Sequence, residues 1–149
     1  MYYGYDTKIG RIYITAEDNY VTGISCKKND EEEKETPLIK KTIQQLTEYF
    51  EGQRKTFDLP LKIDGTEFQK RTWLELTKIP YGKTISYKEL AKAVGNEKAC
   101  RAVGMANNKN KIMIIIPCHR VIGSNGDLTG YAGGVNIKKQ LLDLEAEYA

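Results

Sequence analysis

Residues that bind metals or form disulfides are scarce in this sequence. It has one histidine, His119, and three cysteines, Cys26, Cys100 and Cys118, in 149 residues. No two cysteines have C-x-x-C spacing, so a closed four-ligand zinc site would need carboxylates to complete it. An odd number of widely separated cysteines makes a poor disulfide framework and is typical of reduced intracellular thiols. We therefore expect no metal, no disulfide and no cofactor.

Long apolar runs and a large excess of one charge are also absent. No apolar run approaches the ~18 residues needed to span a bilayer, and the first residues lack the pattern of a signal peptide. The 23 Lys and Arg residues nearly balance the 20 Asp and Glu residues, so the net charge of +3 does not by itself indicate a polyanionic partner. We expect a protein without membrane contact, in the cytoplasm, or in the nucleus if the source is eukaryotic.

The amino-terminal part has the pattern of a small sheet covered by one helix. Residues 1–25 alternate between apolar and polar side chains around a turn at Asp18 and Asn19, which predicts an antiparallel meander. A nearly fully charged stretch, residues 27–36, then predicts a solvated loop. The following helix is predicted from an apolar stripe at Ile39, Ile43, Leu46 and Phe50.

The boundary between two domains falls after residue 63. Residues 57–61 predict an edge strand or an extended linker, because Pro60 cannot donate to a strand ladder. From a helix over residues 66–78 onward, the pattern is helical with short loops. The sequence therefore predicts an α/β domain over residues 1–63, a small antiparallel sheet plus helix, followed by a mainly α domain over residues 64–149.

The second domain predicts a helix-turn-helix. Ser86 is a good N-cap for a helix over residues 87–94, which Gly95 ends. Asn96 then caps a helix over residues 97–107, and two short helices around a tight turn are typical of this motif. Any pair of short helices in a bundle gives the same pattern, so the signal alone is weak.

The rest of the chain predicts a strand, a hairpin and a closing helix. The apolar residues 111–117 predict a buried strand that ends at Cys118. Asn125 and Gly126 lie between two short extended pieces of residues 121–131, which is a strong hairpin signal. A hairpin after a helix-turn-helix is a wing. The closing helix is predicted from an apolar stripe at Ile137, Leu141, Leu144 and Tyr148.

Residues 116–120, Ile-Pro-Cys-His-Arg, place a cysteine beside the only histidine. A cysteine is a nucleophile only as the thiolate, and because free thiols titrate near pH ~8.5, a reactive one needs a base or a positive field. His119 can supply it, directly or through a bridging water. The alternative is a buried structural cysteine beside a solvent-facing histidine, and these five residues alone favour that alternative.

Five separated blocks, in the same order and spacing, resemble the O6-alkylguanine-DNA alkyltransferases. The resemblance is specific over residues 67–145, whereas the amino-terminal part matches only in outline. It implies a ribonuclease-H-like α/β domain followed by a winged helix-turn-helix alkyltransferase domain. The matching segments are residues 81–87, 98–104, 116–121, 130–134 and 138–145, with Asn110 between the second and third.

The resemblance implies roles for four residues at the reacting centre. Cys118 is the alkyl acceptor, and His119 draws its proton through a water. Glu145 matches the carboxylate that orients the histidine, which favours an imidazolium as the thiolate forms. Asn110 matches the residue that holds the active-site segment through backbone hydrogen bonds. Without the motif, Glu145 is an exposed carboxylate near a helix end and Asn110 is a turn residue.

The resemblance also implies a set of DNA contacts on one helix. The lesion lies inside the duplex, so the base must leave the stack before a thiolate can reach it. Arg101 resembles the arginine that fills the vacated place. Its neighbours Cys100, Ala102 and Gly104 are small, as a helix pressed into a minor groove requires. A solvated arginine, or one on a phosphate, and tight packing between helices are the alternatives.

A further group is implied to bind the flipped base. Tyr87 matches the tyrosine whose hydroxyl donates to guanine as O6 departs. The alternative is a core tyrosine whose hydroxyl reaches the solvent. The carbonyls of Cys118 and Val121 resemble acceptors for the exocyclic amine. The loop that closes over O6 is matched by Tyr131, Ala132 and Gly133.

Three departures from the family pattern affect these expectations. Ala132 stands where some members have serine, which costs little if the contact is a backbone N–H. Met113 and Asn107 replace residues that shape the pocket wall, so the tolerance for bulky alkyl groups is open. With no histidine besides His119, the amino-terminal zinc site of some relatives is absent.

Together these residues predict a single-use repair protein. It takes the alkyl group of O6-alkylguanine, and also of O4-alkylthymine, from double-stranded DNA, acting as a monomer that can assemble cooperatively on DNA. A non-catalytic lesion sensor is the first alternative, but such relatives lack the acceptor cysteine. A winged helix-turn-helix regulator is the second alternative; it would bind a specific operator sequence and would not depend on Cys118. A Cys-His peptidase would need an oxyanion loop that the sequence does not show.

Overall fold

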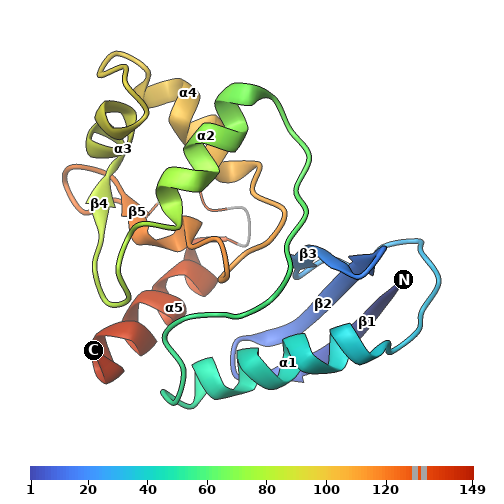
Figure 1. The fold of residues 1–149 in the computed structure, drawn as a ribbon. Coiled ribbons are helices and arrows are strands. Elements are labelled where there is room, and N and C mark those ends of the chain that lie inside the picture. Colours follow the sequence, from blue (N-terminus) through green and yellow to red (C-terminus); the bar gives the residue numbers. More distant parts are fainter. Residues whose placement is uncertain (129–130, 132–133) are drawn as a thin grey trace.

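The computed structural model describes residues 1–128, 131 and 134–149, and the chain forms two parts that lie side by side (Figure 1). One part is a sheet with a helix on one face, and the other is a group of helices with two very short strands. An extended segment joins them. Within the described ranges, no helix is both long and apolar enough to cross a membrane.

The sheet consists of β1 (Tyr2–Thr7), β2 (Gly10–Glu17) and β3 (Tyr20–Ser25), antiparallel in the order β1-β2-β3. Asp18 and Asn19, between β2 and β3, have φ values of 50° and 66°. Two consecutive residues with positive φ are the requirement of a type I′ hairpin turn, and its twist matches that of the flanking strands. The predicted antiparallel meander is confirmed.

The helix on this sheet is α1 (Pro37–Phe50). It begins there because the Thr36 side chain accepts a hydrogen bond from the backbone N–H of Ile39, and because proline tolerates the first helical position. Ile39 and Leu46 of its apolar stripe are fully buried in the core that the sheet also lines. The predicted helix is therefore confirmed, and residues 57–61 form an extended linker beside β3.

The second part begins with α2, whose N-cap Thr66 forms a capping box with Gln69. Ser86 forms the same box with Glu89 at the start of α3, and Gly95, with φ of 93°, follows its end. The elements are α2 (Glu67–Leu76), β4 (Ile85–Ser86), α3 (Tyr87–Ala93), α4 (Cys100–Asn108), the 3-10 turn η1 (Cys118–Arg120), β5 (Val121–Ile122) and α5 (Val135–Tyr148).

The start of α4 differs from the sequence prediction. The side chain of Asn96 accepts from the backbone N–H of Lys98 and so closes a turn, instead of capping a helix at residue 97. The helix begins at Cys100, after Ala99, which gives no side-chain cap. The prediction of a helix over residues 97–107 is therefore wrong at its amino-terminal end.

The predicted strand over residues 111–117 is also wrong. Its backbone closes on itself, since the N–H of Ile116 donates to the carbonyl of Ile112 at 3.1 Å. Ile114 has φ of 73°, a conformation that costs a β-branched residue about 1–3 kcal/mol and breaks an extended run. The segment is a buried loop, and its apolar side chains fill the core between the two parts.

The predicted wing is present only in part. β5 pairs in parallel with β4, an arrangement that the sequence did not predict. A tight turn follows at Asn125 and Gly126, where Gly126 has φ of 85°. Up to residue 128 there is no second hairpin arm in the described chain, and residues 129 and 130 of the predicted hairpin lie outside the described residues.

The two parts meet where β3 touches the loop before Cys118. The N–H of Ile24 donates to the carbonyl of Lys111 at 2.9 Å, and the N–H of Met113 donates to the carbonyl of Ile24 at 3.3 Å. Buried side chains of the sheet, of α1 and of the helical part form one continuous core. The loop that carries Cys118 is therefore fixed to the amino-terminal sheet.

Candidate active site around Cys118

Cys118 opens the 3-10 turn η1, directly after Pro117. Its side chain is only 1% exposed, so the sulfur is buried in this structure. It nevertheless lines a cavity of about 210 Å³. The cavity wall comes from both parts of the chain and includes Ile24, Cys26, Asn110, Met113 and Tyr131.

Asn110 holds the sulfur and the loop together. Its Nδ2 donates to the Sγ of Cys118 at 3.1 Å and to the carbonyl of Ile116 at 2.8 Å. Its Oδ1 accepts from the N–H of Ile112 at 3.0 Å. One buried amide thus links the backbone at both ends of the loop, at Ile112 and Ile116, to the sulfur of Cys118.

The thiol of Cys118 is protonated at rest. Burial raises the pKa of Cys118 to about 11, although the hydrogen bond from Asn110 and the charge of Lys138 both act to lower it. A thiol with this pKa is a poor nucleophile at neutral pH. A reaction at this sulfur therefore requires a base that takes its proton when the substrate is in place.

His119 has the properties of such a base. The ring is fully buried, and its Nε2 lies 2.5 Å from Oε2 of Glu145. Burial lowers the pKa of His119, although the hydrogen bond to Glu145 opposes this shift. Because an ionised carboxylate only accepts hydrogen bonds, Nε2 carries the proton and Nδ1 carries the lone pair. Nδ1 is buried and has no hydrogen-bond partner in the described part of the chain.

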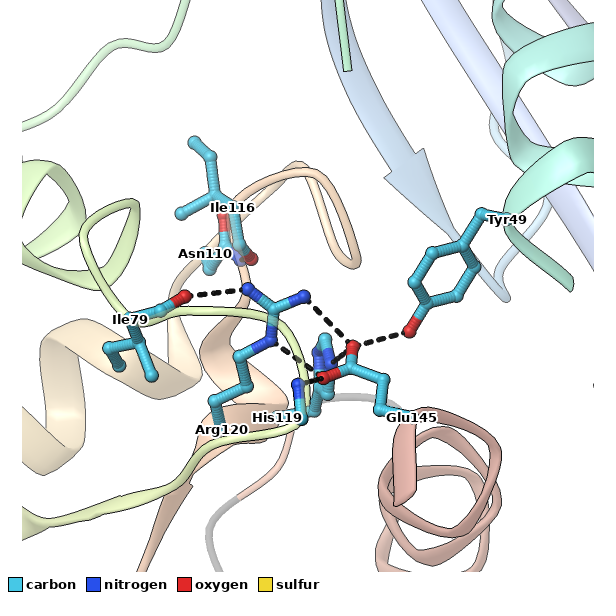
Figure 2. Close-up of polar contacts among 8 residues, drawn as sticks. Tyr49, Ile79, Asn110, Ile116, His119, Arg120 and Glu145 are labelled. Carbon is cyan, nitrogen blue, oxygen red and sulfur yellow. Dashed lines mark hydrogen bonds and ion pairs between the residues drawn. The ribbon is translucent and has the colours of Figure 1, made fainter. Parts of the chain in front are cut away.

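Glu145, on α5, is the centre of the polar network (Figure 2). Burial alone would raise its pKa, but the hydrogen bonds from His119 and Arg120 outweigh burial and hold the pKa well below its usual range. The carboxylate is therefore ionised despite its burial. Its donors are Tyr49 Oη at 2.6 Å, the Gly82 N–H at 3.1 Å, His119 Nε2 at 2.5 Å, Arg120 Nε at 2.8 Å and Arg120 Nη2 at 3.0 Å.

Arg120 is a site residue to which the sequence analysis gave no role. Its guanidinium donates one hydrogen bond to each carboxylate oxygen of Glu145, and its Nη1 donates to the carbonyl of Ile79 at 2.7 Å. Bidentate pairs of this kind fix the geometry as well as the charge of a carboxylate. The sequence signal was its place in the Pro-Cys-His-Arg block, directly after His119.

Lys138 is a second residue without an assigned role. It is fully buried on α5, and its Nζ donates to the carbonyl of Val121 at 2.5 Å. It also lies over the ring of Tyr87, 5.8 Å from the centroid. Lys138 and Glu145 share the buried face of α5 with Leu141. Charged residues on an apolar helical stripe are the pattern that could have identified both.

The two carbonyls expected to bind a guanine amine are already hydrogen-bonded. Val121 accepts from Lys138, and the carbonyl of Cys118 accepts from Asn107 Nδ2 at 3.2 Å. A carbonyl oxygen has two lone pairs, so each keeps capacity for a second donor. Tyr87 is half-buried at the start of α3. Tyr131 is buried beside Cys118, whereas Ala132 and Gly133 lie outside the described residues.

The predicted DNA contacts lie on α4. Arg101 and Ala102 are exposed, and Cys100 and Gly104 are partly exposed. A Cβ added to Gly104 would meet only the ring of Tyr87, at 3.8 Å, which is an ordinary contact. Packing within the molecule therefore does not require the small residues at positions 102 and 104, so the alternative of tight helix packing loses its basis there.

Among the residues that the structure describes, no group of three or more His, Cys, Asp or Glu side chains could hold a metal ion. The titratable side chains gathered here are a buried thiol, a neutral imidazole and an ionised carboxylate.

Two protein-family models together match nearly the whole chain. Residues 1–63 match the model described as 6-O-methylguanine DNA methyltransferase, ribonuclease-like domain. Residues 67–147 match the model described as 6-O-methylguanine DNA methyltransferase, DNA binding domain. The predicted fold class, a ribonuclease-like domain before a DNA-binding domain, is confirmed.

Similar proteins span both parts of the chain. A methylated-DNA–protein-cysteine methyltransferase of Methanosarcina acetivorans is 48% identical over 153 residues, covering 97% of this chain and 98% of that protein. The crystal structure of the Mycobacterium tuberculosis O6-methylguanine methyltransferase matches with a TM-score of 0.90 at 40% identity, over 99% of this chain and 93% of that one. The M. tuberculosis OGT in complex with DNA matches with a TM-score of 0.87 at 42% identity, over 99% and 94%.

Proposed function

Because the chain belongs to the 6-O-methylguanine DNA methyltransferase family, we propose that it repairs DNA by moving the alkyl group of O6-alkylguanine onto the sulfur of Cys118. The observation that carries this proposal is the arrangement at the reacting centre. A thiol that is protonated at rest lies in a cavity, next in sequence to a neutral, buried histidine whose Nδ1 is available. This arrangement suits one proton transfer and one displacement.

The reaction proceeds by in-line displacement at the alkyl carbon. The proton of Cys118 passes to Nδ1 of His119 through a bridging water, and the resulting imidazolium is stabilised by Glu145. The sulfur forms a bond to the alkyl carbon while the bond from that carbon to O6 breaks. Guanine leaves with both bonding electrons, and a donor such as the hydroxyl of Tyr87 assists it. O4-alkylthymine carries the same kind of bond and is a second substrate.

The substrate is double-stranded DNA from which the damaged base is flipped out. The relative from M. tuberculosis crystallised with DNA supports a DNA partner for this chain. The exposed Arg101 and the small, uncrowded residues of α4 suit insertion into a minor groove, since they leave room for close approach of a duplex. Phosphate and shape contacts then make binding depend on salt more than on sequence. The protein acts as a monomer, and copies can assemble along DNA.

Each molecule reacts once. The product is a thioether, which has no acidic proton and is a very poor leaving group, so the sulfur is not regenerated. Intact mass spectrometry before and after incubation with an O6-methylguanine duplex tests the proposal. We expect a gain of one methyl group per chain, located on Cys118 by peptide mapping. Turnover beyond one methyl per chain, or a methyl on another residue, would refute it.

Arg101→Ala should slow transfer from duplex DNA by about tenfold or more while leaving transfer from the free base O6-methylguanine nearly unchanged. The reason is that Arg101 is proposed to fill the gap in the stack, a task that a free base does not require; the loss of one well-placed contact is about 1–3 kcal/mol. Single-turnover rates on both substrates measure it. Lys40→Ala, on the exposed side of α1, is the control for the loss of one positive charge. Equal losses on both substrates would remove this role from Arg101.

A further inference from the structure

One donor to the Glu145 carboxylate comes from the other domain. Tyr49 belongs to α1, on the amino-terminal sheet, and its side chain is fully buried. Its hydroxyl donates to Oε2 of Glu145 at 2.6 Å, and Figure 2 shows the ring reaching across from α1 to the carboxylate on α5. The amino-terminal domain thus touches the group that orients the histidine.

Tyr49 and His119 share a single oxygen. Nε2 of His119 lies 2.5 Å from the same Oε2, and Nη2 of Arg120 donates to it at 3.0 Å. Every donor that binds a carboxylate oxygen draws on its negative charge, which leaves less to stabilise a positive charge on the next donor. The hydroxyl of Tyr49 therefore weakens the attraction of Glu145 for a protonated imidazole.

The position and protonation of Tyr49 are both fixed. Its ring packs against the rings of Phe50, Phe57 and Tyr81, with centroid distances of 5.6, 5.7 and 6.0 Å. Burial and then the charge of Glu145 raise the pKa of Tyr49 far above its ordinary value, so the hydroxyl keeps its proton at every physiological pH. Tyr49 is a permanent donor held in one orientation by its neighbours.

We propose that Tyr49 is a positioning residue for alkyl transfer: it holds Oε2 of Glu145 and limits the pull of that oxygen on His119, so that the imidazole stays neutral and can accept the proton of Cys118. This inference rests on the proposed function. It gives the amino-terminal domain a role in the chemistry, beyond supporting the carboxy-terminal domain. Tyr49 acts through Glu145 and does not touch the reacting atoms.

Several other groups also act on this pair. Gly82 contributes a backbone N–H to Oε1 of Glu145. The titratable and charged side chains that face Glu145 or His119 are Tyr49 from α1, Tyr81 from the loop before β4, Arg120 from η1, Tyr131, and Lys138 from α5. Arg120 and Lys138 oppose protonation of His119 by their charge, in the same direction as the proposed effect of Tyr49.

Tyr49→Phe should raise the pKa of His119 by about half a unit to one unit, because the shared oxygen then binds the imidazolium more strongly; one unit is about 1.4 kcal/mol. His119 is the only histidine in the chain, so ¹⁵N NMR of the imidazole in the full-length, tag-free protein reports its titration directly. The acid limb of the single-turnover rate of methyl transfer should move upward in pH by a similar amount, since transfer needs the neutral ring.

Two matched variants make the test specific. Tyr81→Phe removes a hydroxyl from the neighbouring ring, one that is buried without a hydrogen-bond partner in the described part of the chain, and should leave the His119 titration unchanged. Replacing Tyr49 by 3-fluorotyrosine keeps the fold and gives a stronger donor, so it should lower the pKa of His119. This second variant preserves the test if Tyr49→Phe folds poorly.

Three outcomes would overturn the inference: an unchanged or lowered pKa of His119 in Tyr49→Phe, an equal rise in Tyr81→Phe, or a raised pKa with 3-fluorotyrosine. Failure of the proposed function has a different signature, because wild-type protein would then take up no methyl group. The histidine titration needs no substrate, so the two failures cannot be confused.

Discussion

Cys118→Ala should take up no methyl group from O6-methylguanine DNA, even after prolonged incubation with excess protein. The sulfur is the only atom at this position that can displace guanine, and His119 has no proton to accept once the thiol is gone. Folding should be nearly unaffected, because Asn110 keeps its bonds to the carbonyl of Ile116 and the N–H of Ile112. Intact mass and the retention of the alkyl group on the DNA measure the loss.

The control for this variant is Cys26→Ala. Cys26 lines the same cavity, but it comes from the amino-terminal part and has no link to the imidazole among the described contacts. It should take up one methyl group per chain, as the wild type does. If the Cys118→Ala variant were methylated at Cys26, or took up a methyl group normally at any other residue, the acceptor would have been assigned to the wrong sulfur.

Glu145→Gln should lower the free energy of unfolding by about 3–5 kcal/mol, because it leaves the buried guanidinium of Arg120 without its counter-ion. The rate of methyl transfer should fall by roughly 10²- to 10⁴-fold, the usual contribution of a positioned acid-base group, since the imidazolium of His119 then has no negative charge beside it. Urea unfolding and single-turnover kinetics, at a temperature where the variant is folded, measure the two effects separately.

Glu147→Gln is the matched control on the same helix. Glu147 is exposed, so its substitution should change the unfolding free energy by less than about 0.5 kcal/mol and leave the rate intact. If Glu145→Gln lowered stability but transferred methyl at the wild-type rate, the carboxylate would serve the fold alone, and its role with His119 would have to be abandoned.

Local sequence signals predicted much of the fold. Period-two alternation predicted the meander, and Ser86 was predicted as the N-cap of a helix that the structure has. Short apolar runs carry no period, which is why residues 111–117 were interpreted as a strand. There the side chain of Asn110 hydrogen-bonds the N–H of Ile112 and the carbonyl of Ile116, groups that a strand would pair with a neighbouring strand, and so holds a loop. The helix start predicted after Asn96 was wrong for a related reason, since the Asn96 side chain accepts from the N–H of Lys98 in a turn just before the helix.

The sequence predicted the neighbours Cys118 and His119 directly, and the family resemblance added Asn110 and Glu145 to them. Residues 116–121 carry the thiol and the imidazole, so the sequence alone brought them together. The partners of Glu145 come from α1, from the loop before β4 and from η1, and they converge only in the folded chain. No periodicity or spacing reports such a convergence. Tyr49 in particular is indistinguishable in sequence from any other aromatic residue on a buried helical face.

If each molecule reacts only once, as proposed, the acceptor sulfur of Cys118 has to stay unmodified until the substrate binds. The sulfur of Cys118 is almost inaccessible and its pKa is about 11 before substrate arrives. Peroxides and small soluble electrophiles react with exposed thiolates, so both properties slow such side reactions. The burial that makes Cys118 a poor nucleophile by itself thus also protects its sulfur from oxidation and alkylation before the protein reacts.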